Sequence, residues 1–163
     1  GVDINILTNS LASTDSLVVY SAWERYRGTL IKEGANIYEY QYQGRGKSKL
    51  RDKISKSKAS LHSKSIVFDD SITWIGSFNL DPRSTHLNTE CVVIFDNPKF
   101  AKVFKADLMT DMESAWHVYN KNGKTLWEGD DESKTEIFTY PPDTGIWTRI
   151  LKTLAKILPE SQI

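Results

Sequence analysis

The spacing of hydrophobic and polar positions predicts a strand–helix–strand unit at the start of the chain. Residues 2–7 form a short apolar run typical of a buried strand. Residues 16–33 repeat apolar side chains at helical spacing, with N-cap candidates at Ser13-Thr14-Asp15 and a terminating glycine at Gly34. Residues 36–42 then alternate as a second strand. This order favours a sheet with helices packed on its faces.

The same patterns predict a β-rich continuation. Strands are expected over residues 61–69 and 72–75, joined by a turn at Asp70-Ser71, and over residues 89–95, an apolar run of the buried type. A helix is expected over residues 99–114. Short antiparallel strands are expected at 116–119, 125–128 and 134–140. We therefore predict an α/β fold, a mixed sheet flanked by helices, with a small β extension.

The last predicted helix, over residues 146–158, is amphipathic. Its apolar stripe comprises Trp147, Ile150, Leu151, Leu154 and Leu158, and its polar side carries Arg149, Lys152 and Lys156. This pattern with a Trp anchor is typical of a helix that lies on an anionic membrane surface. A helix docked on its own domain, or on an absent part of the protein, would show the same pattern. Both interpretations are kept, and a lipid substrate would favour the membrane.

Length and composition bound the class of protein. A chain of 163 residues suits one domain with a sizeable core. The 21 Lys and Arg residues equal the 21 Asp and Glu residues, which excludes a broadly basic nucleic-acid-binding protein but permits a local basic patch. The single cysteine, Cys91, excludes an internal disulfide and a cysteine-based zinc cluster, and its apolar surroundings predict an inert core residue. No apolar run reaches the roughly 18 residues of a membrane-spanning helix, and the start at Gly1 is interpreted as that of a fragment or processed piece.

A strongly basic segment precedes the chemical motif. Residues 43–60 have a local net charge of +6, because only Asp52 offsets the basic residues. These are Arg45, Lys47, Lys49, Arg51, Lys53, Lys56 and Lys58. The segment is interpreted either as a solvated loop or as a collar for phosphate groups or an anionic membrane. Its position directly before the motif favours the second interpretation.

The motif combines two patterns. His62, Lys64 and Asp69 fit H-x-K-x4-D, and six residues later Gly76-Ser77-Phe78-Asn79 fits G-S-x-N. A lone H-x-K arises often by chance, whereas the composite is highly specific. Because side chains alternate along a strand, His62 and Lys64 share one side while Asp69 has the opposite parity. We expect His62 and Lys64 to face the reaction and Asp69 to brace the strand end.

The composite resembles the motif of the phospholipase D superfamily. Residues 6–15, residues 76–90 and the tail from Trp127 to Glu160 are most similar to the C-terminal half of bacterial cardiolipin synthases of the phospholipase D type. The resemblance implies phosphatidyl transfer through a phosphohistidine, with another phospholipid or glycerol as the acceptor alcohol. The corresponding organisation is a phospholipase D-like half-domain at 1–119, a β extension at 120–145, and an amphipathic helix and tail at 146–163.

The residue types explain how the motif could process a phosphodiester. The neutral imidazole of His62 can attack phosphorus at physiological pH, and the Lys64 ammonium neutralises the phosphate oxygens. Ser77 and Asn79 offer a hydroxyl and an amide to the same oxygens. Glu90 is a candidate to hold the other ring nitrogen of His62 and so fix its tautomer. No metal and no cofactor are expected, because Lys64 and these donors supply the positive field.

A general acid must protonate the leaving alkoxide. The resemblance implies that a second histidine, in another H-x-K motif, does so. The other histidines, His86 and His117, have no lysine two residues later, and we interpret both as structural or surface residues. The second half-site is therefore expected from a missing N-terminal half or from a second copy, and this chain alone should be inactive or nearly so. His62 is left as either the nucleophile or the general acid.

These observations predict a phosphatidyltransferase similar to cardiolipin synthases. The protein is expected to be peripheral to a bacterial membrane, the inner membrane, with phospholipid substrates and without nucleic acid as a partner. The first alternative is a homodimeric nuclease of the same superfamily, whose basic segment at 43–60 would track DNA phosphates. The second alternative is a non-catalytic fragment that docks on membranes.

Overall fold

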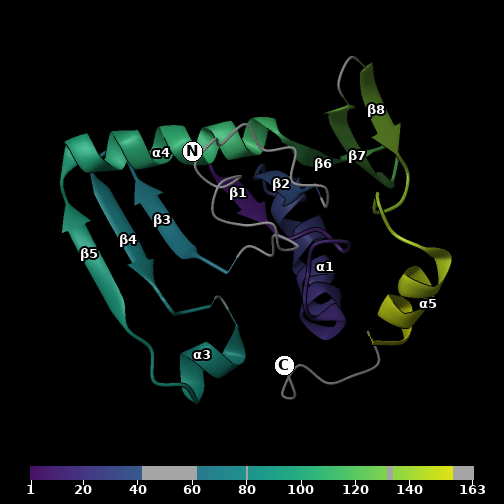
Figure 1. The fold of residues 1–163 in the computed structure, drawn as a ribbon, viewed down its shortest axis with the longest axis horizontal. Coiled ribbons are helices and arrows are strands. Elements are labelled where there is room, and N and C mark those ends of the chain that lie inside the picture. Colours follow the sequence, from purple (N-terminus) through teal and green to yellow (C-terminus); the bar gives the residue numbers. More distant parts are fainter. Residues whose placement is uncertain (42–61, 80, 132–133, 156–163) are drawn as a thin grey trace, which may run out of the picture. The chain divides into compact units, whose positions relative to one another are not determined.

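The computed structural model describes residues 1–41, 62–79, 81–131 and 134–155 (Figure 1). These residues form two compact units. The first unit consists of residues 1–41 and 110–155, and the second of residues 62–79 and 81–109. The basic segment at 43–60 lies outside the described residues, so its expected roles stay predictions.

The first unit is built on a five-stranded mixed sheet (Figure 1). Its strands are β1 (Asn5–Thr8), β2 (Asn36–Tyr40), β6 (Ala115–Lys121), β7 (Lys124–Asp131) and β8 (Lys134–Phe138), in the order β1-β2-β6-β7-β8. β1 and β2 are parallel, and the other neighbours are antiparallel. Between β6 and β7, Asn122 and Gly123 have φ values of 52° and 73°, the left-handed geometry of a two-residue hairpin turn. The predicted α/β class is confirmed, and β7 and β8 continue the sheet from β6.

Helix α1 (Leu17–Lys32) connects the two parallel strands. Its N-cap is Ser16, whose hydroxyl accepts the Val19 N–H, whereas the predicted cap Ser13 is hydrogen bonded to Ser10 in the preceding turn. The helix ends just before Gly34, whose φ of 93° explains the glycine there. The side chains Trp23, Leu30 and Ile31 pack against a core of Ala35, Ile37, Trp116, Val118 and Trp127.

A buried carboxylate ties α1 to the sheet. Glu39 of β2 has no exposed surface and accepts a hydrogen bond from Arg27 at 2.7 Å. Tyr20, Trp23 and Trp127 donate to the same carboxylate at 3.1, 3.3 and 2.9 Å. Burial raises the pKa of the Tyr20 hydroxyl well above its ordinary value, and the Glu39 charge raises it further, so Tyr20 stays a donor. The network compensates the buried charge and holds the helix on the sheet.

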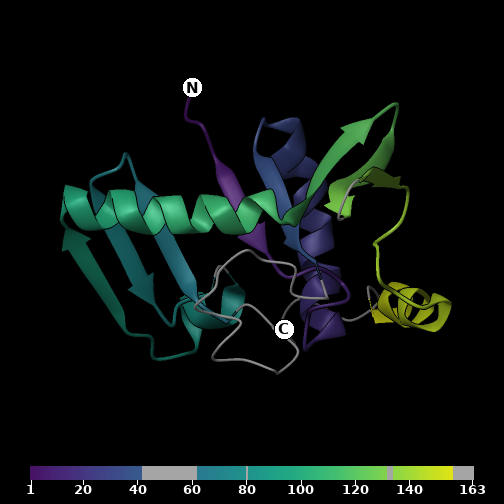
Figure 2. The ribbon, with the colours of Figure 1, turned by 45° about the horizontal axis from the view of Figure 1, so that its top comes forward.

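The second unit contains a three-stranded antiparallel sheet, whose neighbouring strands can be followed in Figure 2. Its order is β3 (Lys64–Phe68), β4 (Ile72–Gly76) and β5 (Val92–Asp96). The short helix α3 (Pro82–His86) lies between β4 and β5 in the chain, and α4 (Pro98–Glu113) follows β5. The Asn97 side chain caps α4 by accepting the N–H groups of Lys99 and Phe100. The strands thus divide between two sheets, a division that side-chain periodicity does not predict.

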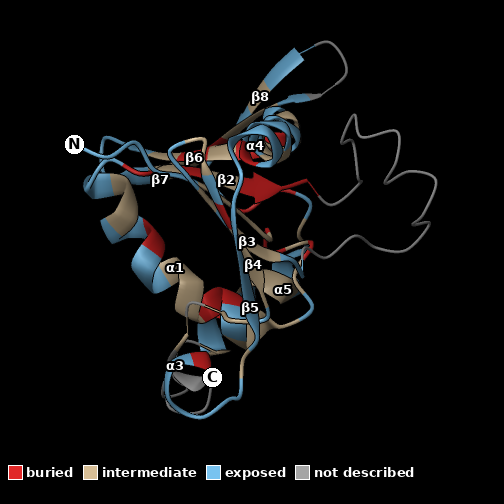
Figure 3. Ribbon diagram, turned by 90° about the vertical axis from the view of Figure 1, so that its left-hand side faces the viewer, coloured by how far each residue is buried: buried red, intermediate tan, exposed pale blue. Residues whose placement is uncertain are grey.

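β5 differs from its expected burial. The strand itself is confirmed, but all of its residues are exposed, in pale blue in Figure 3, and the exposed fraction of Ile94 is 65%. Cys91, just before the strand, is also exposed, so the expectation of an inert core cysteine is wrong. The reason is that an apolar, β-branched run favours a strand whether or not other residues cover it. In the described part of the chain, β5 is an edge strand whose neighbour is β4.

The last predicted helix is confirmed over Ile146–Ala155 as α5, and its polar side contacts the rest of the first unit. Lys156 and Leu158, which were assigned to the same helix, lie outside the described residues. Lys152 is buried, with its Nζ 2.9 Å from Oε1 of Glu24 on α1. The Arg149 guanidinium lies over the Tyr140 ring, 4.1 Å from its centroid. These contacts agree with the interpretation of a helix docked on its own domain as far as its polar side is concerned.

The apolar stripe of α5 is exposed. Its exposed fractions are 67% for Ile146, 75% for Trp147, 43% for Ile150, 53% for Leu151 and 57% for Leu154. The helix therefore does not dock on its own unit through its apolar side. Among the described helices, none has the length and apolar character needed to span a bilayer.

Candidate active site

The histidine and lysine of the motif lie together at the start of β3. His62 is exposed just before the strand, and Lys64 is its first residue. Lys64 Nζ lies 3.2 Å from His62 Nε2 and donates to the His62 carbonyl at 2.9 Å. An ammonium group can only donate, so Nε2 is the acceptor and the imidazole proton belongs on Nδ1. The pair therefore presents an unprotonated Nε2 next to a cation.

Asp69 lies at the opposite end of the same strand. It occupies the β3–β4 turn, where Asp69 and Asp70 have φ values of 46° and 58°. Asp69 follows Lys64 by five positions along the strand, which corresponds to about 17 Å at a rise of about 3.3 Å per residue. The structure thus does not bring Asp69 to the His62–Lys64 pair. Asp70 is held by an ion pair of 2.6 Å with Lys105 of α4, and this contact lowers the pKa of its carboxyl.

The G-S-x-N segment begins directly opposite Lys64, which is paired with Gly76 in the sheet. Gly76 allows the backbone of β4 to approach β5 closely, since a Cβ at this position would lie 2.4 Å from the Cys91 carbonyl oxygen. Ser77 then bridges the two segments twice. Its N–H donates to the Cys91 carbonyl, and its hydroxyl accepts the Cys91 N–H, both at 3.0 Å.

Glu90 organises this segment through serine hydroxyls. Its carboxylate accepts hydrogen bonds from Ser77 Oγ at 2.5 Å, Ser84 Oγ at 2.7 Å and Asn88 Nδ2 at 3.3 Å. These bonds, that of Ser77 first, lower the pKa of the Glu90 carboxyl, and the charge of Lys64 adds to the effect. The expected hydrogen bond from the His62 ring to the Glu90 carboxylate is not formed among the described residues. The assignment of Glu90 as the group that orients the histidine stays a prediction.

Two further residues, Ser84 and Asp81, support the G-S-x-N segment, and neither was assigned a role from the sequence. Ser84 is 5% exposed, and its hydroxyl accepts the Asn79 N–H at 3.2 Å while donating to Glu90. Asp81 accepts the Ser84 N–H at 2.7 Å, as an N-cap of α3. The pattern Asp-x-x-Ser at residues 81–84 is a capping signal and could have indicated this support.

The two predicted phosphate ligands, Ser77 and Asn79, differ in whether their side-chain donors are already used. The only hydroxyl proton of Ser77 is donated to Glu90, so Ser77 cannot donate to phosphate in this arrangement. The side-chain amide of Asn79 has no hydrogen bond to the described residues and is the freer donor. Lys64, with three N–H donors, can also reach an anionic oxygen.

The other two histidines lie elsewhere. His86 is exposed at the end of α3. His117 lies on β6 in the first unit, where its ring is stacked on Tyr38 with centroids 5.2 Å apart and contacts Tyr119. Among the residues that the structure describes, no cluster of three or more His, Cys, Asp or Glu side chains could hold a metal ion.

An imidazole and a lysine side chain in contact at the start of β3 are suited to phosphodiester chemistry, and comparison with known proteins identifies the class. Residues 1–112 match the family model described as cardiolipin synthase, phospholipase D-like domain. The chain belongs to this family, and the resemblance seen in the motif is confirmed.

Two named relatives agree with this assignment. The chain is 37% identical over 163 residues to cardiolipin synthase C of Escherichia coli, covering 98% of the chain and 34% of the relative. It is 30% identical over 143 residues to the major cardiolipin synthase ClsA of Bacillus subtilis, covering 85% and 26%. An uncharacterized protein of Helicobacter pylori is 44% identical over the whole chain and 32% of its own length. The chain thus spans about a third or less of these relatives, and no solved structure matches it.

Proposed function

We propose that this chain supplies one half of the active site of a phosphatidyltransferase similar to cardiolipin synthases. Its family membership supports phospholipid processing. The observation that carries the proposal is the pair formed by His62 and Lys64, in which Nε2 accepts from the lysine and so keeps its lone pair. An imidazole in this state is a nucleophile for phosphorus, and the lysine beside it is a ligand for the phosphate oxygens.

In the first half-reaction, the phosphodiester of a phospholipid approaches the pair. Its anionic oxygens draw the Lys64 ammonium away from Nε2 and take a second hydrogen bond from the Asn79 amide. The Nε2 lone pair of His62 then forms a bond to phosphorus as the bond from phosphorus to the leaving alkoxide breaks. The alkoxide takes a proton from the general acid of the second half-site, and a phosphohistidine remains.

In the second half-reaction, an acceptor alcohol attacks the phosphohistidine. The hydroxyl oxygen of glycerol or another phospholipid bonds to phosphorus, its proton passes to the base of the second half-site, and the N–P bond returns its electrons to Nε2. If His62 were the general acid, its Nε2 would carry a proton. That N–H would face the N–H groups of the Lys64 ammonium, and the two donors would repel each other. This argument favours His62 as the nucleophile and the second histidine as the acid.

The remaining motif residues position the site. Ser77 and Glu90 hold the segment that carries Asn79, and Ser84 fixes its backbone. Asp69 shapes the far turn of β3 and does not contact the phosphate. The chain contains a single H-x-K-x4-D motif, so the second half-site comes from the N-terminal half of a longer protein or from a second copy.

The proposed location is the surface of a bacterial inner membrane, to which the protein is peripheral. The exposed apolar stripe of α5, with Trp147 the most exposed of its residues, supports contact with lipid. We also propose the domain organisation predicted from the sequence, with a half-domain at 1–119, a β extension at 120–145, and an amphipathic helix and tail at 146–163.

The test places this chain in the matching segment of Escherichia coli cardiolipin synthase C, so that the remainder of that protein supplies the second half-site. Lipid products are separated by thin-layer chromatography, and labelled phosphatidyl enzyme is trapped. His62→Ala should lower turnover by at least about 10³-fold and abolish the covalent label. His86→Ala, which removes an exposed histidine of the same unit, should leave both unchanged. Turnover by the His62 variant close to that of the parent would refute the proposal, and plasmid cleavage without lipid product would favour the nuclease.

A further inference from the structure

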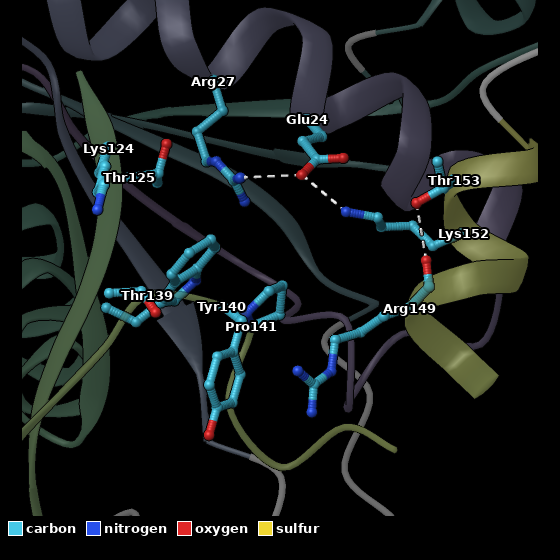
Figure 4. A pocket seen from close by; sticks show the side chains of 11 residues that line it. Glu24, Arg27, Lys124, Thr125, Thr139, Tyr140, Pro141, Arg149, Lys152 and Thr153 are labelled. Atoms are coloured by element: carbon cyan, nitrogen blue, oxygen red, sulfur yellow. Dashed lines mark hydrogen bonds and ion pairs between the residues drawn. The ribbon is translucent and has the colours of Figure 1, made fainter. Parts of the chain in front are cut away.

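The first unit contains a cavity that the proposed catalysis does not use. Its volume is about 380 Å³, within the range of small-molecule sites, and it is lined by α1, β7, the segment after β8, and α5 (Figure 4). Four cationic side chains line it, together with a single carboxylate. They are Arg27, Lys124, Arg149 and Lys152, with Glu24.

Two of the four cations are neutralised within the protein. Arg27 pairs with the buried Glu39 at 2.7 Å. Lys152 pairs with Glu24 at 2.9 Å. Lys124 and Arg149 have no carboxylate partner among the described residues. The cavity therefore keeps two positive charges, contributed by β7 on one side and by α5 on the other (Figure 4).

Arg149 is held in place but has an unused donor. Its guanidinium lies over the Tyr140 ring, and its Nη2 donates to the Thr144 carbonyl at 2.8 Å. The Nε atom is buried and has no hydrogen-bond acceptor among the described residues. A buried N–H of a cation without an acceptor is unfavourable, and an anionic oxygen is the acceptor that would satisfy it best.

We propose that this cavity is a second, non-catalytic site for a phosphate-bearing ligand, with Lys124 and Arg149 as its cationic contacts. The planar guanidinium suits phosphate oxygens, and the lysine ammonium adds a mobile point charge. The ligand chemistry is a phosphate mono- or diester, carried either by a small soluble molecule or by a phospholipid head group. The proposal does not depend on the activity of His62, because no residue of the cavity belongs to the second unit.

The test uses the Lys64→Ala variant of the chain, so that the proposed catalytic site does not contribute to phosphate binding. Binding of inorganic phosphate and of glycerol 3-phosphate is measured by titration calorimetry. Lys124→Gln should weaken binding about tenfold, since one charge-assisted hydrogen bond is lost. Lys121→Gln is the matched control, because Lys121 is the partner of Lys124 across the β6–β7 hairpin, is exposed and does not line the cavity. Arg149→Lys, which keeps the charge, should weaken binding less than Arg149→Gln, with folding checked by circular dichroism.

Vesicles distinguish the two sources of the phosphate. Phosphatidylglycerol vesicles are compared with phosphatidylcholine vesicles in a sedimentation assay with the same variants. Loss of binding in Lys124→Gln but not in Lys121→Gln, for phosphatidylglycerol alone, supports a head-group site. The same difference with the soluble phosphates supports a small-molecule site. Equal effects of the two lysine variants, or no effect of Lys124→Gln on any probe, overturn the proposal.

Discussion

Lys152 of α5 reaches Glu24 of α1, with 2.9 Å between Nζ and Oε1 and both side chains largely buried. This ion pair attaches the polar side of α5 to the first unit. The opposite side of the helix, which carries Trp147, is thereby left outermost. The direction that the apolar stripe faces is thus decided by a charge pair between segments 128 positions apart in the chain.

The exposed stripe predicts that α5 contributes to membrane binding. Leu151→Ser combined with Leu154→Ser should weaken binding to phosphatidylglycerol vesicles at least about tenfold, because each leucine loses about 1.5–3 kcal/mol of apolar transfer. Val103→Ser, which removes an apolar side chain of α4 that is 72% exposed, is the control and should have little effect. If the double leucine variant and Val103→Ser lost vesicle binding equally, α5 would have no specific role in membrane binding. Sedimentation with vesicles provides the measurement.

The hydrogen bonds that Glu90 accepts should stabilise the protein at neutral pH and stabilise it less in acid. The pKa of its carboxyl is lowered from the ordinary value of 4.5 by the hydrogen bonds of Ser77 and then Ser84. Its contribution to folding is therefore fully present above pH 4.5 and is lost as the pH falls through the lowered pKa. The wild-type protein should be more stable than Glu90→Gln at pH 7, and this difference should shrink in acid. Urea unfolding from pH 7 to pH 3 tests it, and a difference independent of pH would contradict it.

Gly76 predicts a steric limit at the junction of β4 and β5. In Gly76→Ala the new Cβ would meet the Cys91 carbonyl oxygen at 2.4 Å, so the strands must separate. The expected cost is about 1–3 kcal/mol of unfolding free energy, with displacement of Ser77. Gly28→Ala is the matched control, since its Cβ would meet nothing within 4 Å in the middle of α1. It should stabilise the protein by about 0.5–1 kcal/mol. A Gly76 variant as stable as the parent in thermal unfolding would refute the argument.

The buried pair of Arg27 and Glu39 predicts a large effect on stability. Arg27→Met leaves the Glu39 carboxylate buried without its cation and should cost about 3–5 kcal/mol of unfolding free energy. Adding Glu39→Gln to this variant removes the unpaired charge and should restore part of the loss. Denaturant unfolding of both variants provides the measurement. If the double variant is less stable than the single one, the uncompensated charge is not the cause.

Local patterns were sufficient for much of the fold. The helix at 17–32, the Asn-Gly turn at 122–123 and the strands around the motif all follow from side-chain periodicity and turn chemistry, which act between neighbours in the chain. The same alternation predicts that His62 and Lys64 lie on one side of the chain, and the structure has the two side chains in contact at the start of β3. Such features are encoded within a few residues and need no knowledge of the rest of the molecule.

Other features were decided by the tertiary structure. Periodicity placed apolar residues together on β5 and on α5 but could not say what covers them, and the structure leaves both exposed. The hydroxyls of Ser77, just after β4, and Ser84 on α3 bind the Glu90 carboxylate, and spacing along the chain did not indicate these contacts. The physical reason is that spacing along the chain determines which side chains share a face, while the partner of that face depends on segments distant in sequence. The sequence by itself therefore determined the nucleophile candidate and its lysine, and the tertiary structure decided which groups hold them in place.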